Sequence, residues 1–199
     1  MSEELRGWVS TWRQNFQYPI SNFQIRWIEP KNLHVTLVPP WQSQEWKVES
    51  EKLKVIKFRP FEIRFNKIAL EPDERRPRMV WATGEAGEEI RKLKKLIEIA
   101  LVDKTRTYAL SKHQATQGFR LHVTLARLKD ADESAPARAR LDSTIESKRA
   151  ERDGSARYNI ELPQNIDWRQ TVSSFVLYRS RLLPQGVDYE VLEEFKFGL

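Results

Sequence analysis

The sequence contains the same five residues twice, at Leu33-His34-Val35-Thr36-Leu37 and at Leu121-His122-Val123-Thr124-Leu125. The chain has three histidines among its 199 residues, so two of the three stand in identical surroundings. Apolar and polar residues alternate in both copies, which is typical of a strand with one buried face. We therefore expect a strand at each copy, with the histidine and the threonine together on the face that is not buried.

The imidazoles of His34 and His122 indicate acid–base chemistry. An imidazole has an ordinary pKa of about 6.5, so one ring can accept a proton near neutral pH while a second ring donates one. Thr36 and Thr124 each lie two residues after a histidine, on the same side of an extended strand, where a hydroxyl can donate a hydrogen bond to an anionic group. This combination suits a reaction at a phosphate without a metal ion.

A single His-x-Thr sequence carries little information, because threonine is common in strands and a surface histidine is ordinary. One copy alone would be interpreted as polar residues on a solvent-exposed sheet face. The repeat changes this interpretation, since chance rarely places two of three histidines in the same four residues. His113 has no such setting: it stands between Lys112 and Gln114, and we expect an exposed loop residue there.

Arg120 is the candidate for a further phosphate contact. It stands two residues before His122 and therefore shares the same side of a regular strand, whereas Arg127 has the opposite parity. A surface arginine without a role remains an alternative for Arg120, since strand ends can twist or bulge.

Composition favours a small cytoplasmic protein with an anionic partner. The 34 basic and 28 acidic residues give a net charge of +6 and a pI near 9.5, which favours partners such as nucleic acid. The absence of cysteine excludes disulfides and thiolate catalysis. The sequence has neither a leader-like start nor an apolar run of about 18 residues, so we expect a soluble cytoplasmic protein without a membrane segment. We also expect a monomer, although the sequence carries no direct signal of the oligomeric state.

The spacing of apolar residues predicts an α+β fold with antiparallel sheets. Short strands alternate with helices, and each half of the chain holds one motif copy, which suggests two related lobes that share a cleft. Besides the motif strands, we expect helices at residues 3–16, 43–57, 86–101 and 129–157, and strands at 23–29, 60–70, 78–83, 172–178 and 189–197, the last two joined by a turn at 184–186.

The tryptophans have two kinds of setting. Trp41 and Trp46 follow the first motif and either line the cleft or pack elsewhere. A second set falls on apolar helix or strand patterns and is assigned to the core, namely Trp8, Trp12, Trp27 and Trp81.

Several stretches of the sequence resemble those of a known family. They are Pro30-Lys31-Asn32-Leu33-His34-Val35-Thr36-Leu37, Arg76-Pro77-Arg78-Met79-Val80-Trp81, Phe119-Arg120-Leu121-His122-Val123-Thr124-Leu125-Ala126-Arg127, and Leu177-Tyr178-Arg179-Ser180 with Gly186-Val187-Asp188-Tyr189. With its paired His-x-Thr motifs, the chain resembles the two-histidine phosphoesterase superfamily, and within it the bacterial and archaeal RNA 2′,3′-cyclic phosphodiesterases, also called 2′-5′ RNA ligases.

The resemblance implies one bilobal domain over residues 1–199, with two antiparallel sheets flanking a central cleft and helices on the outside. It implies hydrolysis of RNA 2′,3′-cyclic phosphate ends to 2′-phosphomonoesters without metal or cofactor, and 2′-5′ RNA ligation as the reverse reaction. His34 would donate a proton and His122 accept one, although the sequence alone allows the opposite roles. Thr36 and Thr124 would hold the non-bridging oxygens of the phosphate.

Two features depart from the family pattern. Members open with a short strand, where this sequence predicts a helix, and Val38-Pro39-Pro40-Trp41 replaces the Phe-Leu-Gly that often follows the first motif. The second departure leaves the substrate open. Alternatives to RNA ends are a small cyclic nucleotide or an ADP-ribose cyclic phosphate, and an RNA-binding module with weak or no catalysis remains a third interpretation.

Overall fold

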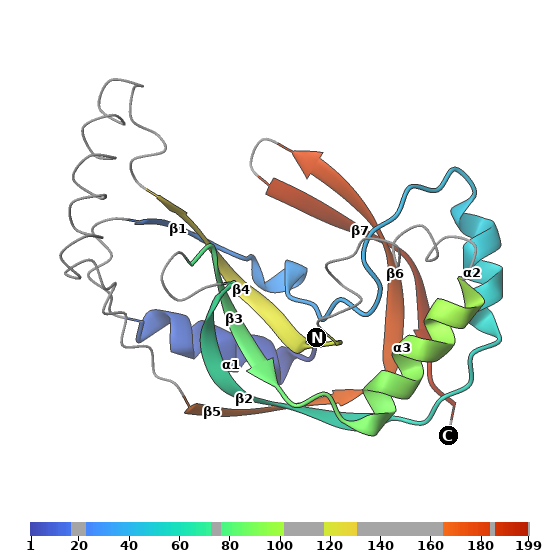
Figure 1. Ribbon diagram of the computed structural model, residues 1–199, viewed down its shortest axis with the longest axis horizontal. Helices are drawn as coiled ribbons and strands as arrows, with labels where there is room; N and C mark the ends of the chain where they lie inside the picture. The colour runs from blue at the N-terminus through green and yellow to red at the C-terminus, as the bar shows by residue number, and fades with distance from the viewer. Residues whose placement is uncertain (17–22, 73–76, 102–117, 131–164, 184–185, 199) are drawn as a thin grey trace.

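The computed structural model of the chain describes residues 1–16, 23–72, 77–101, 118–130, 165–183 and 186–198, and it has an α+β fold with antiparallel sheets, as expected (Figure 1). The larger sheet has five strands in the order β1 (Phe23–Trp27), β4 (Leu121–Asp130), β3 (Met79–Gly84), β2 (Phe61–Glu71) and β5 (Asn165–Val172). The smaller sheet is a hairpin of β6 (Ser174–Leu183) and β7 (Gly186–Lys196). Ser173 alone separates β5 from β6, so the chain passes directly from one sheet to the other.

Helix α1 (Glu3–Gln14) packs on one face of the larger sheet. The Ser2 side chain accepts a hydrogen bond from the Leu5 backbone N–H at 3.2 Å and caps the helix. The predicted apolar stripe buries Leu5 and Val9. They belong to one core cluster with buried strand residues that include Ile63, Phe65, Ile68, Leu70, Val80, Ala82, Leu121, Val123, Leu125 and Trp168. The opposite face of the sheet, which carries His122, is called the open face below.

Helices α2 (Trp46–Lys54) and α3 (Glu88–Ala100) pack against the hairpin, and both were expected from the sequence. Glu88 and Glu89 lie in the first turn of α3, where negative charge is favoured by the helix dipole. A second core cluster joins these helices to the hairpin and contains Leu53, Leu93, Ile97, Leu101, Phe175, Leu177 and Phe195. The fold therefore has two cores, one under each sheet.

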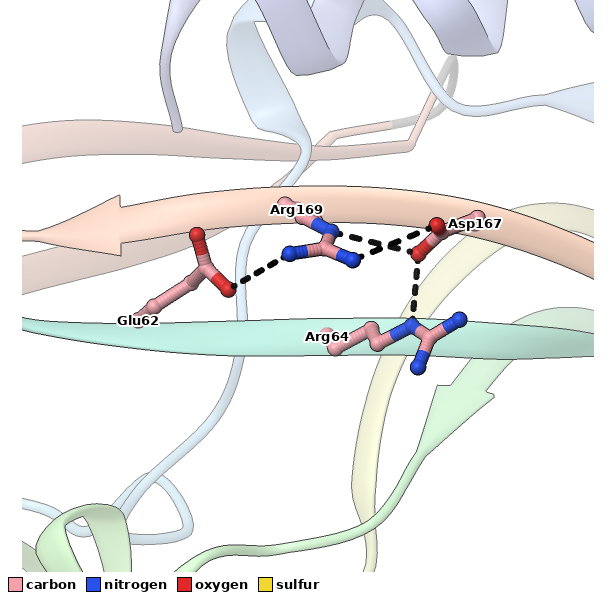
Figure 2. A network of polar contacts seen from close by, with 4 residues as sticks. All are labelled: Glu62, Arg64, Asp167 and Arg169. Atoms are coloured by element: carbon pink, nitrogen blue, oxygen red, sulfur yellow. Dashed lines mark hydrogen bonds and ion pairs between the residues drawn. The ribbon is translucent and has the colours of Figure 1, made fainter.

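Strand β5 has no counterpart among the expected strands. Trp168 is its one buried side chain, so the apolar signal in the sequence is weak. Charged side chains cross from β5 to β2 on the open face: Arg64 Nε lies 2.6 Å from Asp167 Oδ1, and Arg169 lies between Asp167 and Glu62 (Figure 2). The hydrogen bond from Arg64, with a further contribution from Arg169, lowers the pKa of Asp167, so its carboxylate stays charged and the network holds.

The first motif is not a strand, which corrects the expectation. A 3₁₀ helix, η1 (Pro30–Asn32), precedes it, and residues 33–36 have no regular structure. An alternating pattern forms a strand only when a neighbouring strand pairs with it. Within the part of the chain that the structure describes, no ladder includes residues 33–36. Leu33 is buried, whereas His34, Val35, Thr36 and Leu37 are all half-buried, so the burial does not alternate along the first motif as it does along a strand.

The expected helix at 129–157 falls mostly outside the described residues. Its first two residues belong to β4 instead, and residues 131–164 are not described. Likewise, two residues of the expected turn at 184–186 lie outside the described residues. Among the helices that are described, none combines the length and the apolar character that crossing a membrane requires.

Candidate active site

His34 and His122 have the same backbone anchor. The Nδ1 atom of His34 lies 2.7 Å from the carbonyl oxygen of Asn32, and that of His122 lies 2.9 Å from the carbonyl oxygen of Arg120. A carbonyl oxygen only accepts hydrogen bonds, so each Nδ1–H donates. Each neutral ring therefore keeps its lone pair on Nε2, and both rings offer the same nitrogen for proton transfer.

Strand β4 presents His122 and Thr124 together. Leu121, Val123 and Leu125 are each 1% exposed and fix the strand to the core, so the two residues between them face away from it. In the adjacent strand β3, Thr83 lies opposite His122 and Trp81 lies opposite Thr124. This half of the site has the strand geometry that the sequence predicts.

Trp81 packs flat on His122, which corrects its assignment to the core. The ring centroids are 3.8 Å apart and the planes are inclined by 17°. Burial lowers the pKa of His122, and the charges of Arg120 and His34 lower it further, against the opposing effects of the Arg120 carbonyl and Glu71. His122 is therefore held in its neutral form near neutral pH. The charge of His34 is the smallest of these effects on His122.

His34 lies among aromatic rings of the hairpin. Its ring centroid is 4.7 Å from that of Tyr189 in an edge-to-face arrangement and 6.1 Å from that of Tyr178. His34 and Thr36 also line a cavity of about 810 Å³ between the two sheets, together with Trp41 and Arg127. The described lining does not include His122, Thr124 or Trp46. The cavity thus adjoins the first motif more closely than the second.

Arg120 lies on the expected face but is held by a carboxylate. Its guanidinium forms two hydrogen bonds with Glu71, one of them 3.0 Å long. The Glu71 side chain is 9% exposed against 51% for Arg120, so the pair neutralises a buried charge. The hydrogen bond to Glu71 raises the pKa of Arg120. Glu71 holds the Arg120 side chain, and the Arg120 carbonyl accepts the hydrogen bond from His122 Nδ1–H, so Arg120 helps to position the histidine. A contact between Arg120 and a phosphate stays a prediction.

Arg127 is on the open face, contrary to the parity argument. Val80 pairs with Ala126 and Trp81 pairs with Thr124, so Leu125 is an extra residue in β4. Such a bulge reverses the alternation beyond it. Ala126 is buried, and Arg127 is exposed on the side of Thr124. Sequence parity could not find this residue, because the bulge depends on how β3 pairs.

The sequence matches the family model described as the 2′-5′ RNA ligase superfamily over residues 1–161. Two proteins with similar sequences are named RNA 2′,3′-cyclic phosphodiesterase. That of Aquifex aeolicus is 27% identical over 182 residues, which are 87% of this chain and 82% of that protein. That of Archaeoglobus fulgidus is 29% identical over 108 residues, which are 53% of this chain and 57% of that protein.

The fold is also similar to that of solved structures. The TT0787 protein of Thermus thermophilus superposes with a TM-score of 0.68 at 23% identity, with 99% of this chain and 93% of that chain covered. E. coli LigT in complex with 3′-AMP superposes with a TM-score of 0.64 at 17% identity, with 100% and 94% covered. At these identities the similarity concerns the fold, and it confirms the fold class expected from the sequence.

Proposed function

Since this chain belongs to the 2′-5′ RNA ligase superfamily, we propose that it hydrolyses the 2′,3′-cyclic phosphate ends of RNA to 2′-phosphomonoesters. The two relatives described above, from Aquifex aeolicus and Archaeoglobus fulgidus, carry the name of this activity. The observation that carries the proposal is the matched setting of His34 and His122, each anchored through Nδ1 with Nε2 left for the substrate. Two such nitrogens supply the base and the acid that the reaction needs.

In the proposed step, His122 Nε2 accepts a proton from water as the water oxygen attacks phosphorus. The P–O3′ bond breaks, and His34 Nε2–H donates its proton to the leaving 3′ oxygen. The product carries a 2′-phosphate and a free 3′-hydroxyl, and solvent restores both imidazoles. Burial supports this assignment of roles, because it lowers the pKa of His122 and favours the neutral ring that a base requires.

Thr36, Thr124 and Arg127 hold the non-bridging oxygens in this scheme. The two hydroxyls donate hydrogen bonds, and the guanidinium balances the charge that grows as water attacks. Arg120 is the second candidate for this contact. No step uses a metal ion or a cofactor. A 5′-hydroxyl that replaces water would form a 2′-5′ linkage by the same proton transfers, so ligation would use the same two imidazoles.

We also propose that residues 1–199 act as one bilobal, monomeric domain. Ser173 is the short connection between the sheets, and one cavity is lined by both of them. The site would be incomplete in either half alone, because His122 comes from the larger sheet and Tyr189 of the smaller one packs on His34.

The test is incubation of the purified protein, with a chelator, with a short RNA that ends in a 2′,3′-cyclic phosphate. We expect a 2′-phosphate product, and we expect His34→Ala and His122→Ala each to lose about 10²- to 10⁴-fold in rate. His113→Ala is the matched control, since it removes the third imidazole. A 3′-phosphate product, a need for added metal, or equal loss in all three variants would contradict the proposal.

A small cyclic nucleotide is the second candidate substrate. The cavity beside His34 favours it, because about 810 Å³ lies within the range of small-molecule sites. Turnover of a cyclic mononucleotide faster than that of cyclic-phosphate RNA would select this candidate. RNA binding without turnover by the parent protein would select the non-catalytic interpretation.

A further inference from the structure

Cations gather on the open face where β1 pairs with β4. Arg26 lies directly opposite Arg127, and Gln24 lies directly opposite Lys129. All four side chains are exposed. Ile25 and Leu128 alternate with them and pack on the core, so the polar residues share the side of His122 and Thr124. Arg26, Arg127 and Lys129 are called the basic cluster below.

Within the described part of the chain, the basic cluster has no carboxylate partner. Like charges directly opposite each other on antiparallel strands are unfavourable. No ion pair between described residues includes Arg26, Arg127 or Lys129, whereas Arg64 and Arg120 on the same sheet both contact carboxylates. Among the described residues this repulsion is not offset, and a polyanion laid along the cluster would offset it.

The cluster is continuous with the site but extends well beyond one phosphate. Arg127 lines the cavity that also contains His34 and Thr36. Lys129 follows Thr124 by five residues of the same strand, one of which is the bulged Leu125, so at about 3.3 Å for each of the other four its Cα lies about 13 Å farther along. A ligand that touches both Thr124 and Lys129 must therefore be longer than one nucleotide.

We propose that Arg26 and Lys129 bind backbone phosphates on the 5′ side of the cyclic end, so that the substrate is an RNA chain and not a mononucleotide. The inference rests on the proposed function. Such contacts fix the position of the chain without reading its bases, so this cluster confers no sequence preference. It makes binding depend on salt, because each phosphate that a cation neutralises releases counterions.

The experiment measures binding and turnover with the double variant Arg26→Gln/Lys129→Gln. The matched control is Lys47→Gln/Lys95→Gln on α2 and α3, which removes the same net charge from exposed lysines away from the site. Binding is read by fluorescence anisotropy with a labelled ten-nucleotide RNA that ends in a 2′-phosphate, from about 50 to 300 mM salt. Turnover is compared for cyclic-phosphate RNA and for a cyclic mononucleotide.

We expect the double variant to bind the RNA about ten-fold more weakly at low salt. The slope of log affinity against log salt should fall by about 1.4, which is two contacts at about 0.7 each. kcat/KM should fall about ten-fold for RNA and less than about two-fold for the mononucleotide. The control pair should change each quantity by less than about two-fold, since overall charge is its one effect.

Equal effects of the two double variants would overturn the inference, and so would a salt slope that the double variant leaves unchanged. If the parent protein hydrolyses both substrates equally well with a flat salt response, the inference fails while the proposed function stands. If the parent hydrolyses neither substrate, the proposed function fails, and the anisotropy measurement still decides whether the basic cluster binds RNA.

Discussion

Replacing Trp81 with leucine should both slow the reaction and change its pH dependence. The substitution removes the flat contact on His122, whose centroid distance is 3.8 Å. Aromatic contacts of this kind contribute about 0.5–1.5 kcal/mol beyond the area they bury. Trp81 Nε1 is buried and has no hydrogen-bond partner among the described residues, so leucine sacrifices no hydrogen bond to them. If the loss of this contact removes about 1 kcal/mol of transition-state stabilisation, kcat falls about five-fold at pH 7.

The direction of the pH effect follows from the cause of the shift. Burial lowers the pKa of His122, and a smaller side chain at position 81 admits water, so the pKa should move up toward its ordinary value. The base must be neutral to act, and activity is lost as the pH falls through this pKa. The acidic limb of kcat/KM should therefore move to higher pH in Trp81→Leu, and the loss of rate should be largest at low pH.

The assay is kcat/KM for cyclic-phosphate RNA between about pH 5 and 8, with an NMR titration of the His122 ring as a direct reading of its pKa. Trp46→Leu is the control, because Trp46 packs against the second core cluster and does not line the cavity. An acidic limb that stays in place or moves to lower pH would refute the reasoning. So would a loss as large as that of His122→Ala, since stacking alone cannot supply it.

Three further substitutions test other parts of the structure. Gly186→Ala should destabilise the protein by about 1–3 kcal/mol in thermal denaturation, because φ is +134° there; an added Arg26→Ala should not restore stability, since the strain lies in the backbone. Arg127→Gln should lower kcat about ten- to hundred-fold with little change in melting temperature, and an equal loss of stability would instead indicate a structural role. Phe65→Ala should cost about 3–5 kcal/mol in chemical denaturation because Phe65 is fully buried; a cost below about 1 kcal/mol would contradict its place in the core.

The elements that the sequence predicts well are those with local signals. The stripe of Leu5, Val9 and Trp12 identifies α1 without knowledge of its partner, and the alternation around His122 identifies β4. The same alternation around His34 gives the wrong element, because a strand also requires a neighbour to pair with. Two identical pentapeptides thus adopt different structures, and the anchoring of both imidazoles survives the difference.

The residues that sequence reasoning misses depend on pairing between distant segments. The side of the strand on which Arg127 lies is set by the bulge at Leu125, which appears only when β3 and β4 are aligned. Trp81 has the apolar setting of a core residue, but its face is decided by the same pairing. Strand β5 has one buried residue and is held largely by its pairing with β2, so its own sequence contains little apolar pattern that predicts a strand. Periodicity describes one segment at a time, whereas the site is assembled between segments.

Because Ser173 alone connects β5 to β6, the backbone angles at this one residue set the direction in which the hairpin leaves the larger sheet. β6 has ten residues and is therefore about 33 Å long, with its root beside β5 at one edge of the larger sheet and its tip, at Gly186, against Arg26 at the other edge. A rotation of about 10° at the root would displace the tip by about 6 Å. The position of Tyr189 against His34 is thus sensitive to the backbone angles at Ser173, and the tip is placed so that a side chain added at Gly186 would meet the Arg26 guanidinium.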